Sequence, residues 1–466
     1  MSEEFKNQGG ASNSEPNPLA RWIISKLFMS RLASPEYQSK QREKAERLRR
    51  KSGSRPEITY FHQVDDGYSH LAVQMLKALV VRYDVDVRCY IVESLNDPNN
   101  PEPELLSRLA QYDASKIATH YGLGFPELAA PASCAADAHL LQAQSILAAL
   151  DTTAFINHAA SVSEAFWRRD AGALTQLAGS LGSRSAADTR SAVAQGNARR
   201  AELGHYSGAM FYYGNEWYWG VDRLYHLEDR LSGLGLDRER GTPPIAPRPA
   251  VSFGPHKDNG SLTFEIYPSL RSPYTAIVFD RAVQMAQEVG VTLSVRPVLP
   301  MVMRGVPATP TKGRYIMSDC GREARADGVA FGPIYDPIGN PVRRAYSLYP
   351  WACNQGKGNA LLSTFLRLAF AEGVNTNSEK GLRKVVEGAG LSWTEAQGHL
   401  GSDDWKDIVE KNRLAMYQSG LWGVPSFRLL DEAGKEVLAL WGQDRLWLFS
   451  REIQRILEER VAKGKR

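Results

Sequence analysis

Residues 441–446 read Trp-Gly-Gln-Asp-Arg-Leu, and residues 219–224 read Trp-Gly-Val-Asp-Arg-Leu. Five of the six positions are identical across an offset of 222 residues. Two earlier pairs of segments match in the same order, namely residues 66–69 with 272–275 and residues 204–207 with 423–426. Ordered matches of this kind predict that one domain occurs twice in the chain. Differences between the two copies then indicate where the chemistry has changed.

The flanking sequence predicts the same order of elements in each copy. In the first copy it is a strand at 58–61, a tight turn, a helix at 68–83 and a strand at 85–92, which is a βαβ unit with parallel strands. Helical residues from about 100 to 200 and a hairpin at 210–219 follow. The corresponding segments of the second copy are 262–267, 273–289, 291–295, a helical insert and the hairpin 426–440. This order predicts an α/β fold class with two tandem thioredoxin-like domains, each with a helical insertion.

A chain of 466 residues is too long for one core, and its composition suggests where it divides. We expect a polar tail and a basic amphipathic helix at 1–54, a first domain at 55–235, a Pro-rich linker at 236–260 and a second domain at 261–460. Within the first of these, residues 40–51 carry seven basic and two acidic side chains. This arm fits a membrane surface or nucleic acid. The favoured alternative is a solvated helix that packs Trp22 and Leu27 on the body of the protein.

Composition indicates an ordinary soluble protein, with 43% hydrophobic residues, 23% charged residues and a net charge of +4. No apolar run approaches the roughly 18 to 20 residues that span a bilayer. The first residues are polar and acidic, unlike a secretory signal, so we expect no transmembrane segment and a cytoplasmic location. The four cysteines, of which no two lie within thirty residues, exclude a Cys-x-x-Cys pair and therefore a disulfide oxidase. We expect each of them to be a small buried side chain.

Two segments of the second copy are candidates for chemistry. Ser272, with Pro273 after it, precedes the first helix, where unsatisfied backbone N–H groups and the helix dipole stabilise anions, thiolates included. A simple helix cap is the alternative role for this serine. Before the hairpin, Gly423-Val424-Pro425-Ser426 places a proline at the start of a strand. We expect a cis Val424–Pro425 bond that leaves the Val424 backbone free to pair with an extended peptide.

These segments, together with Pro273-Tyr274, Phe427 and Trp441–Leu446, resemble the 2-hydroxychromene-2-carboxylate isomerases. That family belongs to the DsbA-like branch of the thioredoxin superfamily, beside the kappa-class glutathione transferases. The resemblance covers Leu262 to about Leu457, and the first copy is a more distant relative. It makes both predicted domains DsbA-type.

The resemblance implies a glutathione cofactor and a reversible isomerisation about a double bond. Ser272 would be the catalytic residue that donates a hydrogen bond to the glutathione sulfur, and Val424 would pair with the tripeptide main chain. The cofactor-binding residues would be Tyr274, Val424, Pro425, Asp444 and Arg445, although a cap and salt-bridge role fits the last two equally. No metal site is implied.

The chain departs from the family at the loop Pro300–Arg304, where two methionines and Arg304 stand. They would line an apolar pocket with one cation, or form a core edge beside a solvated arginine. The second of these is slightly favoured. Cys353 is not at the redox position and is expected to be a packing residue.

In the first copy, Asp66 corresponds to Ser272 and Tyr206 corresponds to Pro425. A carboxylate repels a thiolate, and the proline is absent, so we expect no glutathione there. Five side chains could still converge on the same mouth as a metal or acid–base cluster, namely His62, Asp65, Asp66, His70 and His205. Their spacing does not specify such a site.

The function expected is a glutathione-dependent isomerase or transferase, working from the second domain on a small aromatic or carbonyl acid. The expected partners are this substrate and glutathione, with no nucleic acid and with a homodimer as one option. The alternative is a non-catalytic tandem scaffold that holds a peptide at the same edge, because fold alone does not decide between them.

Overall fold

A computed structural model describes residues 15–95, 97–127 and 138–464. The chain divides into two compact units. We call Lys40–Pro249 the N-terminal unit. The C-terminal unit consists of Ala250–Arg466 together with the residues up to Ser39. In the described ranges, no helix is long and apolar enough to cross a membrane.

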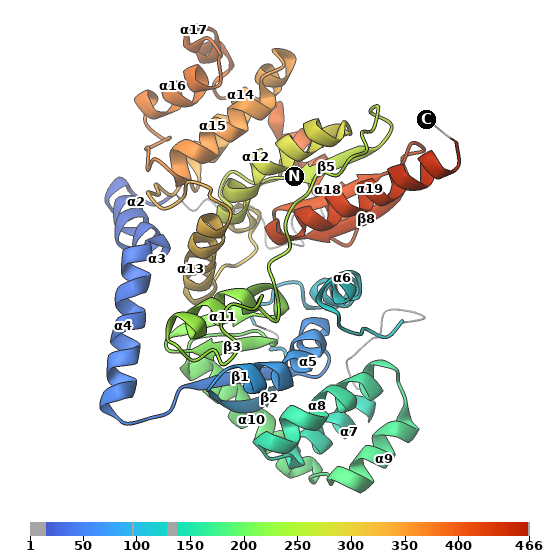
Figure 1. The fold of residues 1–466 in the computed structure, drawn as a ribbon. Coiled ribbons are helices and arrows are strands. Elements are labelled where there is room, and N and C mark those ends of the chain that lie inside the picture. The colour runs from blue at the N-terminus through green and yellow to red at the C-terminus, as the bar shows by residue number, and fades with distance from the viewer. Residues whose placement is uncertain (1–14, 96, 128–137, 465–466) are drawn as a thin grey trace. The chain divides into compact units, whose positions relative to one another are not determined.

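The N-terminal unit contains a four-stranded mixed sheet of order β2-β1-β3-β4 (Figure 1). Strand β1 (Glu57–Gln63) pairs in parallel with β2 (Asp86–Val92) and antiparallel with β3 (Met210–Tyr213), which forms a hairpin with β4 (Glu216–Trp219). The crossover between the parallel strands is helix α5 (Gly67–Arg82). The predicted βαβ unit and hairpin are therefore confirmed.

The helices between β2 and β3 form the predicted insertion. They are α6 (Pro103–Ile117), η2 (Ala118–Tyr121), α7 (Ala138–Ala149), α8 (Thr152–Trp167), α9 (Ala171–Leu181) and α10 (Ala186–Glu202). Helix α10 packs along β2, and α7 packs against α8 and α9. Elements η3 (Val221–Arg223) and α11 (Leu224–Gly233) close the unit. Helix α4 (Pro35–Lys51) precedes the sheet in the chain.

The C-terminal unit repeats this order with the sheet β6-β5-β7-β8. Strand β5 (Thr263–Tyr267) pairs in parallel with β6 (Thr292–Val295) and antiparallel with β7 (Ser426–Leu430), and β7 pairs with β8 (Glu436–Trp441). Helix α12 (Pro273–Val289) is the crossover. In the core, the ring of Phe264 stacks on Phe427 at 5.6 Å, and both meet Phe449.

The remaining helices of this unit lie between β6 and β7 or at the two ends of the chain (Figure 1). Those of the insert are η4 (Met301–Arg304), α13 (Pro310–Ala326), α14 (Asn340–Asn354), α15 (Gly358–Phe370), α16 (Glu379–Gly388), α17 (Trp393–Ala396), η5 (Gln397–His399) and α18 (Trp405–Gln418). The terminal elements are α2 (Pro18–Ile23), the π-helix η1 (Ile24–Met29), α3 (Ser30–Ala33), η6 (Gln443–Arg445) and α19 (Leu446–Ala462).

The N-terminal helices depart from the predicted packing. Trp22 and Leu27, which we expected to pack on the body of the protein, are 47% and 53% exposed. Arg21 and Ser25 are buried instead. The prediction was wrong because the polar side of this helix makes hydrogen bonds to the backbone of residues 336–338.

Candidate functional site

Ser272 lies at the N-terminus of α12 and caps it. Its Oγ accepts a hydrogen bond from the backbone N–H of Thr275 at 3.1 Å, and Pro273 takes the first helical position, where its missing N–H costs nothing. The same hydroxyl donates to the carbonyl oxygen of Val424 at 3.3 Å. Ser272 is only 7% exposed. The buried Ser272 hydroxyl therefore both caps α12 and contacts the Val424 backbone.

The segment Gly423–Ser426 enters β7 beside this serine. The Val424–Pro425 peptide bond is cis, as predicted. Gly423 is required sterically, because a Cβ there would lie 2.3 Å from the Trp441 ring. Val424 is partly exposed and Pro425 is buried. The structure thus brings Ser272 together with Val424 and Pro425, although Ser272 and Val424 are 152 residues apart in the chain.

Tyr274 uses its hydroxyl inside the unit. It donates a hydrogen bond of 2.7 Å to Asp319, a fully buried carboxylate on α13 that also pairs with Arg322 at 2.9 Å. Its ring packs against Ile277 and Cys320. The hydroxyl of Tyr274 therefore joins α12 to α13.

Asp444 and Arg445 form the salt bridge that was one of their two predicted roles. The Arg445 guanidinium lies 3.4 Å from the Asp444 carboxylate and is buried. Their neighbour Gln443 donates to the buried Glu323 at 2.7 Å, a pairing that the sequence did not predict because the two residues lie on distant segments.

The loop Pro300–Arg304 contributes a cation, Arg304, beside the segment that leads into Val424. Arg304 is 1% exposed, so the expectation of a solvated arginine is wrong. It donates to the carbonyl oxygen of Trp422 at 3.4 Å, two residues before Val424. Lys312 lies 5.4 Å from the centre of the Trp422 ring. Arg304 and Lys312 therefore both contact Trp422, two residues before Val424.

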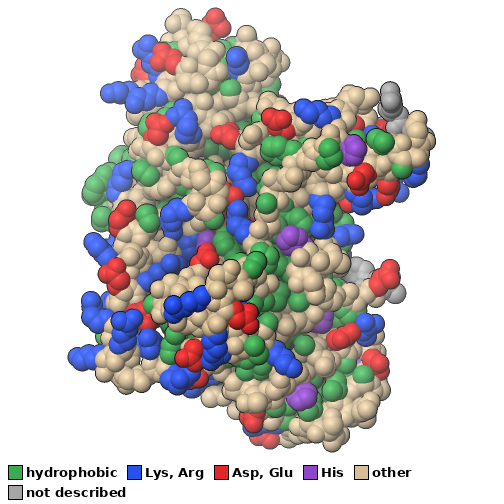
Figure 2. Space-filling view, viewed as in Figure 1, with side chains coloured by type: hydrophobic (Ala, Val, Ile, Leu, Met, Phe, Trp, Pro, Cys, Tyr) green, Lys and Arg blue, Asp and Glu red, His purple; other side chains and the backbone are tan. Residues whose placement is uncertain are grey.

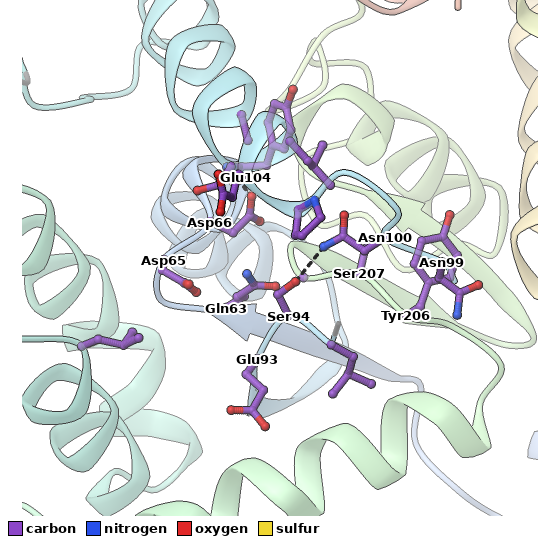
Figure 3. A pocket seen from close by; sticks show the side chains of 18 of the residues that line it. Gln63, Asp65, Asp66, Glu93, Ser94, Asn99, Asn100, Glu104, Tyr206 and Ser207 are labelled. Atoms are coloured by element: carbon purple, nitrogen blue, oxygen red, sulfur yellow. Dashed lines mark hydrogen bonds between the residues drawn. The ribbon is translucent and has the colours of Figure 1, made fainter. Parts of the chain in front are cut away.

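At the corresponding helix start of the N-terminal unit, most charged side chains are acidic. A cavity of about 960 Å³ lies between the start of α5, the segment after β2, helices α6 and α7 and the segment before β3 (Figure 3). Its carboxylates are Asp65, Asp66, Glu93, Asp97 and Glu104, whereas Arg108 is the one Lys or Arg side chain among the lining residues that the structure describes.

Asp66 occupies the helix-capping position in this cavity. It accepts hydrogen bonds from the backbone N–H groups of Tyr68 and Ser69 and from the Ser69 hydroxyl. Burial raises the pKa of its carboxyl to about 6, and the nearby Asp65 adds to the rise. Burial raises the pKa of Asp65 as well. An anionic ligand would meet this negative charge, so the cavity disfavours a thiolate.

The metal or acid–base cluster that the sequence left open does not form, because its three histidines lie away from Asp65 and Asp66. His62, His70 and His205 are all buried, and none of them lines the cavity. Burial lowers their pKa values to about 3, 4 and 3. His62 pairs with Tyr60 and His70 with Ser163. These side chains are buried in the core, and the described residues contain no group of ligands that could hold a metal ion.

The strand register also corrects one correspondence between the copies. Pro425 O accepts from Gly442 N at 3.0 Å, and Ala209 O accepts from Gly220 N at 2.8 Å. Ala209, not Tyr206, therefore holds the place of Pro425. The sequence match of 204–207 with 423–426 was therefore shifted by three residues, although the segments before β3 (203–209) and before β7 (419–425) have the same length.

The cysteines fulfil their predicted role only in part. Cys320 is buried, whereas Cys353 is exposed and is not a packing residue. Cys89 is partly buried. Cys134 lies outside the described residues.

One family model matches a part of the chain that lies within the C-terminal unit. Residues 263–454 match the DSBA-like thioredoxin domain. No curated protein sequence matches the chain.

Solved structures resemble one unit of this chain. A 2-hydroxychromene-2-carboxylate isomerase is 18% identical over 43% of this chain and 98% of its own, with a TM-score of 0.37. A probable DsbA oxidoreductase from Streptomyces coelicolor is 20% identical over 42% and 90%, with a TM-score of 0.33. The cytosolic disulfide reductase DsbM from Pseudomonas aeruginosa is 18% identical over 43% and 98%, with a TM-score of 0.32.

Proposed function

We propose that the C-terminal unit binds glutathione and acts as a glutathione-dependent isomerase or transferase on a small aromatic or carbonyl acid. The observation that supports this most directly is the position of the Ser272 hydroxyl, at a helix N-terminus and 3.3 Å from the Val424 carbonyl. A bound glutathione would supply a thiolate nucleophile that adds reversibly to a double bond.

The residues present fit an anionic thiol peptide. The Ser272 hydroxyl can turn from Val424 to donate a hydrogen bond to the sulfur, which favours the thiolate over the thiol. The N-terminus of α12 adds its positive dipole end. The Val424 backbone would pair with the tripeptide. Arg304 and Lys312 lie beside Trp422, two residues before Val424.

We further propose that the two units arose by tandem duplication. Their sheets have the same strand order and the same strand directions. A tyrosine–aspartate hydrogen bond recurs as Tyr68–Asp113 and Tyr274–Asp319, both at 2.7 Å and both with a separation of 45 residues. On this view the N-terminal unit lost thiol binding when its mouth became acidic.

Calorimetric titration with reduced glutathione tests the function. We expect one site per chain, a loss of affinity of about tenfold in Ser272→Ala and no change in Asp66→Asn. The loss follows from removal of the donor to the sulfur, while Asp66→Asn is a matched control because it alters the same helix position in the other unit. A Ser272→Ala variant with wild-type affinity would contradict the role of the serine.

A scaffold without catalysis is the second candidate, and the low exposure of Ser272 favours it. Such a protein would hold a peptide against the Val424 backbone and would not need an accessible hydroxyl. No heat of binding with millimolar glutathione would support the scaffold over the enzyme. Turnover of a conjugated aromatic acid that depends on both glutathione and Ser272 would exclude it.

A further inference from the structure

The first helices of the chain are packed with their polar side inward. Arg21, Ser25, Met29 and Ala33 recur every four residues and form the buried face of α2, η1 and α3. Arg21 Nη1 donates to the carbonyl oxygens of Asp336 at 2.8 Å and of Ile338 at 2.7 Å. These bonds fix the orientation of the helix on the C-terminal unit.

Ser25 strengthens the same attachment. Its Oγ accepts from the Asp336 N–H at 2.8 Å and donates to the Arg21 carbonyl at 2.6 Å. A rotation of this helix about its axis would leave the guanidinium of Arg21 without these carbonyls, so the outward direction of the opposite face is set by buried hydrogen bonds.

The opposite face exposes large apolar side chains to solvent. Six of the twelve most exposed large hydrophobic residues in the described ranges lie within ten positions, namely Leu19, Trp22, Ile23, Ile24, Leu27 and Phe28. In Figure 2, hydrophobic side chains gather on the surface over α2 and α3, and Lys and Arg side chains follow α4. Single exposed apolar residues are ordinary, but a contiguous patch indicates a binding surface.

Charge indicates what this apolar face meets. Residues 16–35 contain no Asp or Glu, and their basic residues outside the buried face are Lys26 and Arg31, because Arg21 is buried and pairs with Glu15. The basic segment 40–51 follows directly in the chain. An apolar helix face accompanied by basic residues is typical of helices that lie in the interface of an anionic bilayer, where Trp, Leu and Phe enter the headgroup region.

We propose that α2, η1 and α3 dock this apolar face on the surface of a membrane that contains anionic lipid. A second copy of the chain is a poorer occupant, because a two-fold interface brings the same patch of both chains together. Lys26 and Arg31 of both copies would then lie in one interface, and residues 16–35 supply no carboxylate to pair with them.

Vesicle co-sedimentation of the full chain tests the proposal. The probe is a phosphatidylcholine vesicle with about one third phosphatidylglycerol, compared with pure phosphatidylcholine at the same salt concentration. We expect binding to the first vesicle that weakens as salt is added. In Trp22→Ser/Leu27→Ser the partition coefficient should fall by about tenfold or more, because two inserted side chains are lost.

The control removes two equally exposed apolar side chains elsewhere. Leu141→Ser/Val461→Ser changes residues that are 55% and 59% exposed, and it should bind vesicles as the wild type does. All four positions are at the surface, so both variants should fold, and a thermal scan checks this. No binding of the wild type at low salt, or an equal loss in both variants, would overturn the proposal.

Sedimentation velocity tests whether a second copy of the chain, and not a membrane, covers the apolar face. A wild-type dimer that becomes a monomer in Trp22→Ser/Leu27→Ser would assign the face to a second copy and overturn the membrane assignment. If the wild type and both variants have the same association state, the apolar face does not bind a second copy, and the vesicle assay alone decides the membrane assignment.

Discussion

At the residue scale, the first helical turn of each unit carries a different acceptor. Ser272 and Asp66 both cap a helix after the first strand and both bind the N–H of the residue three positions ahead. The serine is neutral and can donate a proton to a hydrogen bond, whereas the aspartate can donate only while it is protonated. The two capping side chains therefore differ in whether they can donate a hydrogen bond once the carboxyl group is deprotonated.

A prediction at this scale concerns the Tyr274 hydroxyl. Tyr274→Phe removes the donor to Asp319 and leaves that buried carboxylate with one partner fewer, so the free energy of unfolding should fall by about 1 to 3 kcal/mol. Urea denaturation measures the change. Tyr68→Phe is the matched variant in the N-terminal unit, where the hydroxyl binds Asp113 in the same way.

The same variant separates a structural role from a ligand role. If Tyr274 only joins α12 to α13, glutathione affinity should change by about twofold or less while stability falls. A large loss of affinity with unchanged stability would instead make the tyrosine a ligand-binding residue.

At the element scale, the N-terminal helices are attached to the body by close backbone packing. A Cβ on Gly321 of α13 would lie 2.6 Å from the Ala33 carbonyl oxygen and 3.0 Å from the Ala33 Cα. Arg325 donates to the same carbonyl at 3.1 Å. Because these are backbone atoms, no rotation of a side chain can make room for a larger residue.

Gly321→Ala should therefore loosen α3 from α13. We expect a loss of about 1 to 3 kcal/mol in the free energy of unfolding and faster proteolysis within residues 18–33. The control is Gly313→Ala on the same helix, where an added Cβ meets no atom within 4 Å. That change should be neutral or stabilising by up to about 1 kcal/mol. Equal effects of the two changes would show that close packing is not the cause.

At the scale of the whole molecule, acid should act on the N-terminal unit through its buried histidines. The pKa values of His62, His70 and His205 are depressed below their unfolded values by burial, so their contribution to stability is complete above about pH 6.5 and is lost as the pH falls. At pH 5 the loss is about 2 kcal/mol for each histidine. Asp66 works in the opposite direction, because its raised pKa means that the folded chain binds this proton more tightly than the unfolded chain does, so acid adds stability through this group.

Hydrogen exchange with mass spectrometry measures this effect separately in each unit. Exchange in the peptides from residues 40–249 should accelerate between pH 7.5 and pH 5 after correction for the intrinsic rate. His70→Asn, which keeps a polar partner for Ser163, should reduce the acceleration. An unchanged pH dependence in that variant would mean that His70 does not titrate on unfolding.

Sequence reasoning predicted the local elements because their causes are local. The βαβ order, the hairpin at 210–219 and the serine cap at 272 each depend on strand patterns, turn residues or a side chain within a few positions. The contact between Ser272 and Val424 was also predictable, since parallel and antiparallel pairing bring both segments to one edge of the sheet. The correspondence of Pro425 with Ala209 was not predictable, because it depends on the hydrogen-bond register between strands.

The sequence by itself determined the order of helices and strands, the repeat of that order and the residue types at each helix start. Only the tertiary structure decided which faces are buried. The polar side of α2 faces inward because Arg21 and Ser25 find backbone partners more than three hundred residues away, which helical periodicity cannot indicate. The histidines are likewise directed into the core and the carboxylates into the cavity, because burial and charge at a site are sums over distant segments.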